Sequence, residues 1–477
     1  MSISYPQKHP HLLITFLFMH KAIRENGKEF CRFFVYTSFQ VKEMSVPLLD
    51  GFSSSVYDNN RKGGSAMEYT KRNRAMTLFL WVIGFEYIAC NLAHPMTPAI
   101  IKTLHLGDYM FGLAFAAMAI TNFLFSPFWG KITKNIRLST LMLISCCGYG
   151  AGQCLFMLAR NEAMILTARA FSGIFASGYS VVPMIYIVDY SPEGKQGRNL
   201  TLMTTLTVVS GAFGYLVGGV LGDISISFCF LIQIAGMVLS GILFFCVMRR
   251  NEQAPKKETQ QIRILLREAN PFSAFLSIRP YFCKALVALF ASILCAFIAY
   301  NAFEQCFNYY MIDQFDFSTS YNGAVKAVTG IVSLLANLTL CMAILRRRKI
   351  DFPLTIMLFL CALFAILMIL MPNLIAFLAI AMVFFGCTAV FQPLLQEQVA
   401  ERSRAQEQGS GVIMGFYNAV KSLGMIFGAL VAGFIYDLLP ELPFWMAGLF
   451  FALAALCSLF YCRLHRRERQ HASQGKD

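Results

Sequence analysis

Long apolar segments separated by short polar loops make up the chain from about residue 75 onward. Twelve such segments occur, the first from about Ala75 to Ile101 and the last from about Phe444 to Tyr461. Each approaches the ~20 apolar residues that an α-helix needs to cross a hydrocarbon core. In lipid only helices and closed barrels satisfy their backbone polar groups, and these segments are far longer than barrel strands. The pattern therefore predicts an all-α membrane protein with twelve transmembrane helices in a lipid bilayer.

Two polar stretches divide the sequence further. Residues 1–66 hold one apolar run, which is too short to span a membrane, and their Ser-, Gly- and Asn-rich end is typical of a poorly ordered segment. The interpretation that we favour places the true start near Met67, and a regulatory tail is the alternative. The predicted organisation is an N-terminal extension at 1–66, six spans in 67–248, a cytoplasmic linker at 249–280, six spans in 281–463, and a cytoplasmic tail at 464–477.

An internal repeat supports two related halves. Gly214–Gly219 in the fifth span is followed by Asp223, and Gly428–Gly433 in the eleventh span is followed by Asp437 at the same spacing. Small residues recur in membrane bundles because they let helices approach. The shared spacing of glycines and a terminal aspartate nevertheless favours a duplication.

The net charge of +14 reports topology, because the basic residues lie in alternate loops. They follow the second, fourth, sixth, eighth, tenth and twelfth segments, whereas the opposite loops hold little beyond Lys102 and Arg160. This alternation places both ends of the bundle and the linker in the cytoplasm. We therefore expect a multi-pass plasma-membrane protein and no nucleic-acid partner.

Metal, cofactor and enzyme chemistry are not indicated. Most of the 15 cysteines lie within apolar segments, where a thiol behaves as a small hydrophobe. No Cys-x-x-Cys pair, histidine cluster or phosphate-binding loop occurs in the sequence. We expect no metal, no cofactor and no catalytic residues.

Among the ionisable residues within the spans, four stand out: Glu86, Arg169, Glu304 and Lys421. Such groups are costly in lipid and mark functional sites by default. Burial disfavours the ionised form of a carboxyl group, so a buried carboxyl can bind and release a proton near neutral pH. We predict that Glu86, Arg169 and Glu304 couple transport to protons. The alternative is that these charges pair and fasten the bundle. Lys326, near the start of the eighth span, is expected to snorkel to the surface.

Polar and aromatic side chains accompany these charges at helical spacing. Those predicted to line a substrate cavity are Asn91, His94, Asn308, Tyr310, Gln392 and Lys421. Pro95 and Pro98 are expected to kink the first span, which is tolerated where helices flank a cavity.

Local motifs over residues 70–465 resemble the major facilitator superfamily. In the loop after the second span, Gly130 matches the family pattern, but Lys134 stands where the pattern has aspartate. In the fourth span, Arg169 and Gly173 match the pattern Arg-x-x-x-Gly. The family places an arginine of this kind beside the proton path.

The fifth span is similar to that of drug–proton antiporters in the same superfamily. Gly214, Gly218 and Gly219 keep the glycine face of the pattern Gly-x-x-x-Gly-Pro-x-x-Gly-Gly, while the proline is absent. Gly130, Lys134, Gly173 and these glycines are the predicted gating and helix-packing positions. We expect the fifth-span glycines to pack against the other half of the bundle.

The resemblance implies two pseudo-symmetric six-helix bundles that rock about a central cavity. It implies a monomer that exports drugs or other lipophilic or amphipathic small molecules in exchange for protons. Cavity charges of both signs would also suit a symporter or exchanger for one polar metabolite, such as a sugar, nucleoside or organic anion. The sequence leaves both functions open.

Removing residues 1–66 is expected to leave membrane insertion and transport intact, because the segment supplies neither a span nor a cavity residue. Quantifying the inserted protein and its transport rate after truncation tests this. Loss of stable protein, with translation held equal, would show that the extension belongs to the working molecule.

Overall fold

The computed structural model describes residues 64–133, 135–191, 195–252, 272, 279, 283–347, 350–404 and 410–474. The chain divides into two units, Met1–Met67 and Glu68–Asp477, and the helical bundle belongs to the second. Lys134, most of the predicted extension at 1–66 and most of the predicted linker at 249–280 lie outside the described residues.

The N-terminal half of the bundle contains α2 (Gly64–Asn91), α3 (Met96–Thr103), α4 (Met110–Ile132), α5 (Leu138–Met157), α6 (Glu162–Tyr190), α7 (Gln196–Ile224) and α8 (Ile226–Arg249). Within it, α4 packs on α6, and α5 packs on both α6 and α8.

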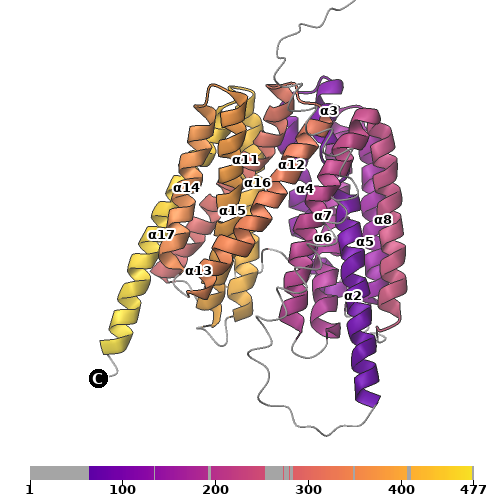
Figure 1. Cartoon of the computed structure of the whole chain (residues 1–477), viewed down its shortest axis with the longest axis horizontal. Coiled ribbons are helices and arrows are strands. Elements are labelled where there is room, and N and C mark those ends of the chain that lie inside the picture. The colour runs from indigo at the N-terminus through magenta and orange to yellow at the C-terminus, as the bar shows by residue number, and fades with distance from the viewer. Residues whose placement is uncertain are drawn as a thin grey trace, which may run out of the picture. The chain divides into compact units, whose positions relative to one another are not determined.

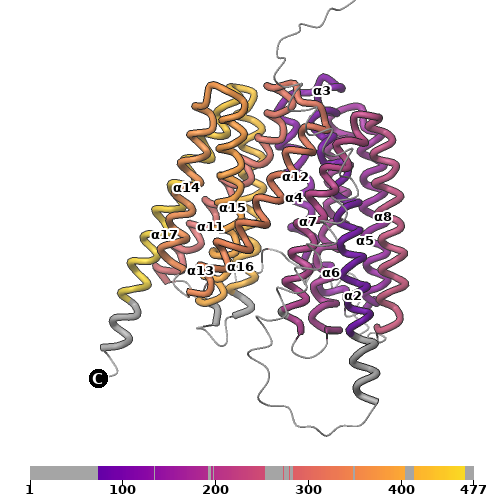
Figure 2. Tube along the Cα trace, in the orientation of Figure 1, coloured from indigo at the N-terminus to yellow at the C-terminus, as the bar shows by residue number. Residues whose placement is uncertain are grey.

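The C-terminal half contains α11 (Lys284–Asp313), α12 (Thr319–Ala336), the π-helix η3 (Asn337–Cys341), α13 (Met342–Arg346), α14 (Asp351–Ile369), α15 (Leu374–Arg404), α16 (Ser410–Tyr436) and α17 (Leu442–Gln474). Its central helix is α11, which packs on α16 and α17. Figure 1 shows the N-terminal part of α2 and the C-terminal part of α17 at the same end of the bundle, and the coloured parts of the Cα trace in Figure 2 agree.

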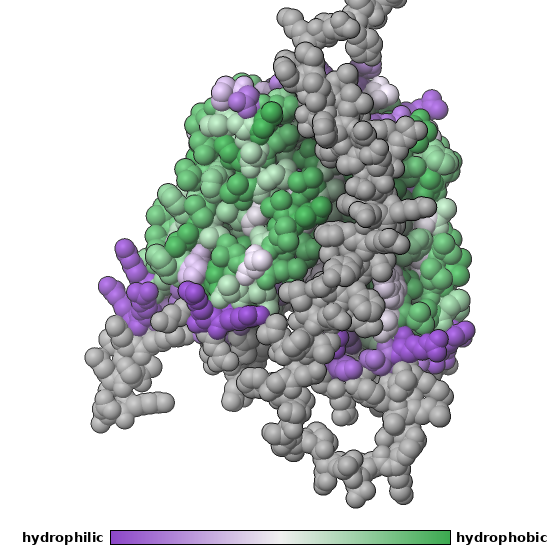
Figure 3. All heavy atoms as spheres, viewed as in Figure 1, coloured by the Kyte–Doolittle hydropathy of each residue, from purple (hydrophilic) through white to green (hydrophobic). Residues whose placement is uncertain are grey.

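Twelve helical segments of the described chain are long and apolar enough to cross a membrane, as the sequence predicts. On the described surface visible in Figure 3, hydrophobic residues cover the side of the bundle, and hydrophilic residues gather at its two ends. Large apolar side chains on the outer surface, such as Trp81 and Phe352, are mostly exposed. Such a surface suits contact with lipid rather than with water.

The first span is broken, as its prolines predict. Helix α2 ends at Asn91, and a turn at 92–95 leads into α3. Pro95 has no N–H and disfavours helical geometry at the residue before it. The backbone N–H of His94 donates instead to the Asn91 carbonyl at 3.3 Å. At the C-terminus the structure differs from the prediction. Helix α17 continues to Gln474, well past the expected end of the span at Tyr461.

The two halves share a buried core at the α3 end of the bundle. One apolar cluster contains most of the C-terminal half together with Met96, Met110, Phe111 and other residues near the α3 end of the N-terminal half. A second cluster, which includes Phe79 and Tyr186, lies wholly within the N-terminal half. The halves are therefore joined at the α3 end, while the rest of the N-terminal half has a core of its own.

Hydrogen bonds between the halves reinforce this contact. The carboxylate of Asp437, which follows α16, accepts from the Tyr109 backbone N–H at 3.0 Å, where α4 begins. The carboxylate of Asp223, in α7, accepts from the Ser318 hydroxyl at 3.0 Å and from Thr319, where α12 begins. Negative charge at a helix N-terminus is favourable because the N–H groups there lack helical partners.

Two close backbone contacts accompany the two aspartates. A Cβ added at Gly433 would lie 3.1 Å from Gly112 Cα, and one added at Gly219 would lie 3.1 Å from Gly323 Cα. These four glycines, with Asp223, Asp437 and the helix starts at Tyr109 and Thr319, form what we call the inter-half interface. The two copies of the predicted repeat thus occupy equivalent places, each packing on a helix of the opposite half.

The predicted packing of the fifth-span glycines is correct for Gly219 only. Added Cβ atoms at Gly214 and Gly218 would lie 2.5 and 1.9 Å from the carbonyl oxygens of Ile88 and Leu92, in the same half. Positions 214 and 218 are one turn apart and face α2, whereas position 219 is rotated by about 100° toward α12.

The other described glycines of the predicted set differ from one another. A Cβ at Gly173 would lie 2.2 Å from the Met118 carbonyl oxygen, so α6 packs tightly on α4 there. A Cβ at Gly130 would meet nothing closer than 4.0 Å, at Val181, so helix packing alone does not require glycine at this position.

Candidate functional site

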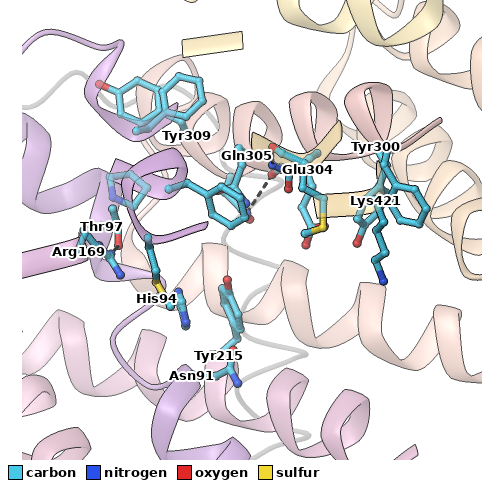
Figure 4. Close-up of a pocket in the computed structure, with 18 of the residues that line it drawn as sticks. Asn91, His94, Thr97, Arg169, Tyr215, Tyr300, Glu304, Gln305, Tyr309 and Lys421 are labelled. Carbon is cyan, nitrogen blue, oxygen red and sulfur yellow. Dashed lines mark hydrogen bonds between the residues drawn. The ribbon is translucent and has the colours of Figure 1, made fainter. Parts of the chain in front are cut away.

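A cavity of about 360 Å³ lies between the two halves. Helices α2, α3, α4, α6 and α7 line one side, and α11, α15 and α16 line the other. Its wall combines aromatic side chains with amides and charges (Figure 4). Few polar groups in an otherwise apolar wall are typical of small-molecule sites.

Helix α11 supplies the largest share of the wall. Its lining residues are Phe297, Tyr300, Asn301, Glu304, Gln305, Asn308 and Tyr309. Their spacing of three and four residues puts them along one face of the helix. On the opposite side of the wall, the Tyr215 ring stacks on His94 with ring centroids 5.7 Å apart.

Arg169 is a nearly buried cation in the cavity wall, with 5% of its surface exposed. Its guanidinium carbon lies 4.1 Å from the centre of the Phe156 ring, and one terminal nitrogen donates to the Thr97 hydroxyl. Its Nε is buried and has no hydrogen-bond partner among the described residues. Arg169 also forms no ion pair within the described ranges.

Glu304 is held by a neighbouring helix. Lys326 Nζ lies 3.0 Å from its carboxylate. Lys326 is 7% exposed and sits 5.1 Å from the centre of the Phe385 ring. The expectation that Lys326 snorkels to the surface is therefore wrong, because a carboxylate and an aromatic face satisfy it inside the bundle.

We expect Lys326→Met to lower the free energy of unfolding by about 1–3 kcal/mol, because it leaves the Glu304 carboxylate without its cation. The lower end applies if water reaches Glu304, whose side chain is 26% exposed. Thermal unfolding in detergent measures the effect. The double variant Lys326→Met/Glu304→Gln should recover most of the loss, and additive losses would show that the pair does not contribute.

Lys421 enters the cavity from α16, and Figure 4 places it on the opposite side from Arg169. Its Nζ lies 5.0 Å from the centre of the Phe297 ring. Within the described part of the chain, it forms no ion pair. Arg169 and Lys421 are thus cations of opposite halves that face one cavity, and neither has a carboxylate partner among the described residues.

Glu86 lies outside the cavity wall. It is 0% exposed, and neither carboxylate oxygen has a hydrogen-bond partner among the described residues. Its neighbours one turn away on α2, Ile83 and Cys90, belong to the second apolar cluster. An unpaired carboxylate in such a place is costly, so this arrangement favours the neutral acid.

Most of the predicted cavity residues do come together. The wall contains Asn91, His94, Asn308, Gln392 and Lys421, along with the predicted coupling residues Arg169 and Glu304.

The prediction that Tyr310 lines the cavity is wrong. Its ring packs against the rings of Phe377 and Phe444, with centroids 5.8 and 5.3 Å away. Sequence reasoning missed Tyr300, Asn301 and Tyr215. Tyr300 and Asn301 lie one turn before Glu304 on the same face, so their spacing from Glu304 could have predicted them. Tyr215 lies within the glycine motif, which was interpreted only as a helix-packing surface.

Residues 79–418 of the chain match the family Major Facilitator Superfamily. The chain is 22% identical over 377 residues to multidrug resistance protein 1 of Bacillus subtilis (strain 168), covering 79% of this chain and 93% of the relative. It is also 22% identical over 382 residues to the quinolone resistance protein NorA of Staphylococcus aureus (strain MSSA476), with the same coverage of 79% and 93%.

Two solved structures share the fold. The human organic anion transporter MFSD10 (TETRAN) aligns with a TM-score of 0.58 at 16% identity, over 81% of this chain and 99% of that one. A bacterial homologue of the human lysosomal transporter Spinster, in an inward-facing and unoccupied conformation, aligns with a TM-score of 0.63 at 14% identity, over 82% and 97%. At these identities the likeness concerns the fold alone.

Proposed function

This chain belongs to the major facilitator superfamily, and on that premise we propose that it exports amphipathic small molecules across the membrane in exchange for protons. The observation that carries the proposal is the charged, aromatic cavity between two halves that join at one end. Relatives that match most of the chain are named for multidrug and quinolone resistance, which supports export of drug-like compounds.

The arrangement suits alternating access. The inter-half interface and the Lys102–Asp313 ion pair, with 2.7 Å between Nζ and the carboxylate, join α3 and the starts of α4 and α12 to the opposite half. Opening this end and closing the other would expose the cavity to the other side of the membrane. Basic residues concentrate at the opposite end, so we place that end and both termini in the cytoplasm of a plasma-membrane protein.

Glu86 is the proposed coupling carboxyl, because a buried acid without a partner can be neutral in one conformation and ionised in another. Arg169 and Glu304, at the cavity, are proposed to link that proton to the bound molecule. All three act by changing charge state or charge pairing, with no covalent chemistry. We propose that a monomer suffices for the cycle.

Reconstituted vesicles test this function. The purified protein is incorporated into liposomes, a pH gradient is imposed, and uptake of ethidium and of norfloxacin is followed by fluorescence. Uptake of at least one of the two compounds that requires the gradient and collapses with a protonophore is the expected result. Gradient-independent uptake, or none of either compound, would contradict it.

A carrier for one polar metabolite is the second candidate, favoured by cavity charges of both signs. The same vesicles distinguish it, because saturable uptake of a single hydrophilic compound with indifference to drugs would replace the export proposal.

A further inference from the structure

The charges around the cavity do not balance. Glu304 is the carboxylate in its described wall, and Lys326 already offsets it at 3.0 Å. Arg169 and Lys421 then remain without a counter-ion among the described residues. His94, whichever form it takes, adds no negative charge.

Cations in a low-dielectric site are costly unless something neutralises them. The aromatic rings beside Arg169 and Lys421 contribute only part of that stabilisation. Arg169 also keeps a buried Nε that donates to no described group. A planar guanidinium with a vacant donor is suited to a carboxylate, sulfonate or phosphate oxygen.

We propose that this cavity selects amphipathic organic anions, with the anionic group bound by Arg169 and attracted also by Lys421. The apolar part of the molecule lies against the aromatic wall, where Phe297 and Tyr215 contribute rings. The two cations belong to α6 and α16, so a bound anion interacts with both halves at once. The inference rests on the proposed function only in taking this cavity as the substrate site.

Direct binding to the full chain in lipid nanodiscs tests the charge preference. Three probes of one shape are compared by equilibrium dialysis: naphthalene-2-carboxylate, 2-naphthamide and 2-naphthylmethylammonium, with empty nanodiscs as the blank. The carboxylate should bind at least about tenfold tighter than the amide, and the ammonium weakest. Equal or tighter binding of the ammonium would overturn the proposal.

Variants then identify the residues that cause the preference for the carboxylate. Arg169→Gln should weaken carboxylate binding about tenfold and the amide little, Arg169→Lys should restore part of the loss, and Lys421→Met should weaken the carboxylate several-fold. Glu304→Gln should act in the opposite direction and tighten carboxylate binding, because Lys326 would lose its partner. Arg160→Gln, at an exposed loop cation, is the matched control.

Gel filtration confirms that each variant is folded before it is compared. Unchanged carboxylate affinity in folded Arg169→Gln would overturn the assignment. Preferential binding of the carboxylate without pH-driven uptake would contradict the proposed function and support this inference. Gradient-driven uptake of ethidium, with no preference for the carboxylate probe, would support the proposed function and overturn this inference.

Discussion

Glu86→Gln is expected to abolish proton-driven transport, with a loss of at least about a hundredfold, while the protein still inserts and folds. Glutamine keeps the volume and the hydrogen-bonding groups of glutamate but cannot titrate. The site is fully buried in α2 and offers the carboxyl no described partner, so the substitution breaks no described hydrogen bond there. The measurement is gradient-driven uptake into vesicles at equal protein density, together with the melting temperature.

Glu441→Gln provides a matched control, since it makes the same chemical change at an exposed residue between α16 and α17. It should leave uptake unchanged. If Glu86→Gln retains the full dependence on the pH gradient, the coupling role belongs to another group, and Glu304 is the next to test.

Gly219→Leu is expected to block the transport cycle, lowering uptake more than about tenfold with little loss of expressed protein. A Cβ at this position would lie 2.5 Å from the Thr319 backbone oxygen, across the inter-half interface. Backbone cannot move aside as a flexible side chain can, so the α3 end would be held apart. Cysteine accessibility at that end, together with uptake, measures the effect.

Gly218→Leu should behave differently although it is the adjacent residue. Its Cβ would lie 1.9 Å from the Leu92 carbonyl oxygen, inside the N-terminal half, so we expect lower melting temperature and poor expression. Gly415→Leu, where an added Cβ meets nothing within 4 Å, is the neutral comparison. Identical outcomes for Gly218 and Gly219 would show that the distinction between packing within and between halves is mistaken.

The spans were predictable because backbone polar groups in lipid must be hydrogen-bonded within the protein, which leaves only helices and closed barrels. A long apolar run therefore predicts a transmembrane helix. The break before α3 was predictable for a similar local reason, since Pro95 removes a donor and restricts the residue before it. Most of the predicted cavity residues do lie in the wall, because polar residues at helical spacing share a face, as with Asn308 one turn after Glu304.

The failures concern which way a helix faces. Tyr309 and Tyr310 are adjacent and chemically alike, yet a rotation of about 100° puts the first in the cavity and the second among phenylalanines. Glu86 was predicted as a coupling carboxyl, and its position outside the cavity wall depends on how α2 packs, which the sequence does not give. The partner of Lys326 is 22 residues distant, so only the docking of α12 beside α11 determines it.

The inter-half interface has a further consequence for how such a chain arose. Each half contributes one carboxylate and one receiving helix start, so the contact has the self-complementary form of an isologous dimer. A six-helix ancestor would already carry both surfaces and would pair with a second copy of itself. If the repeat reflects such a duplication, fusion into one polypeptide would free the two copies to differ. Among the described residues, Asp223 accepts hydrogen bonds from Ser318, Thr319 and Ser320, whereas Asp437 accepts one from Tyr109.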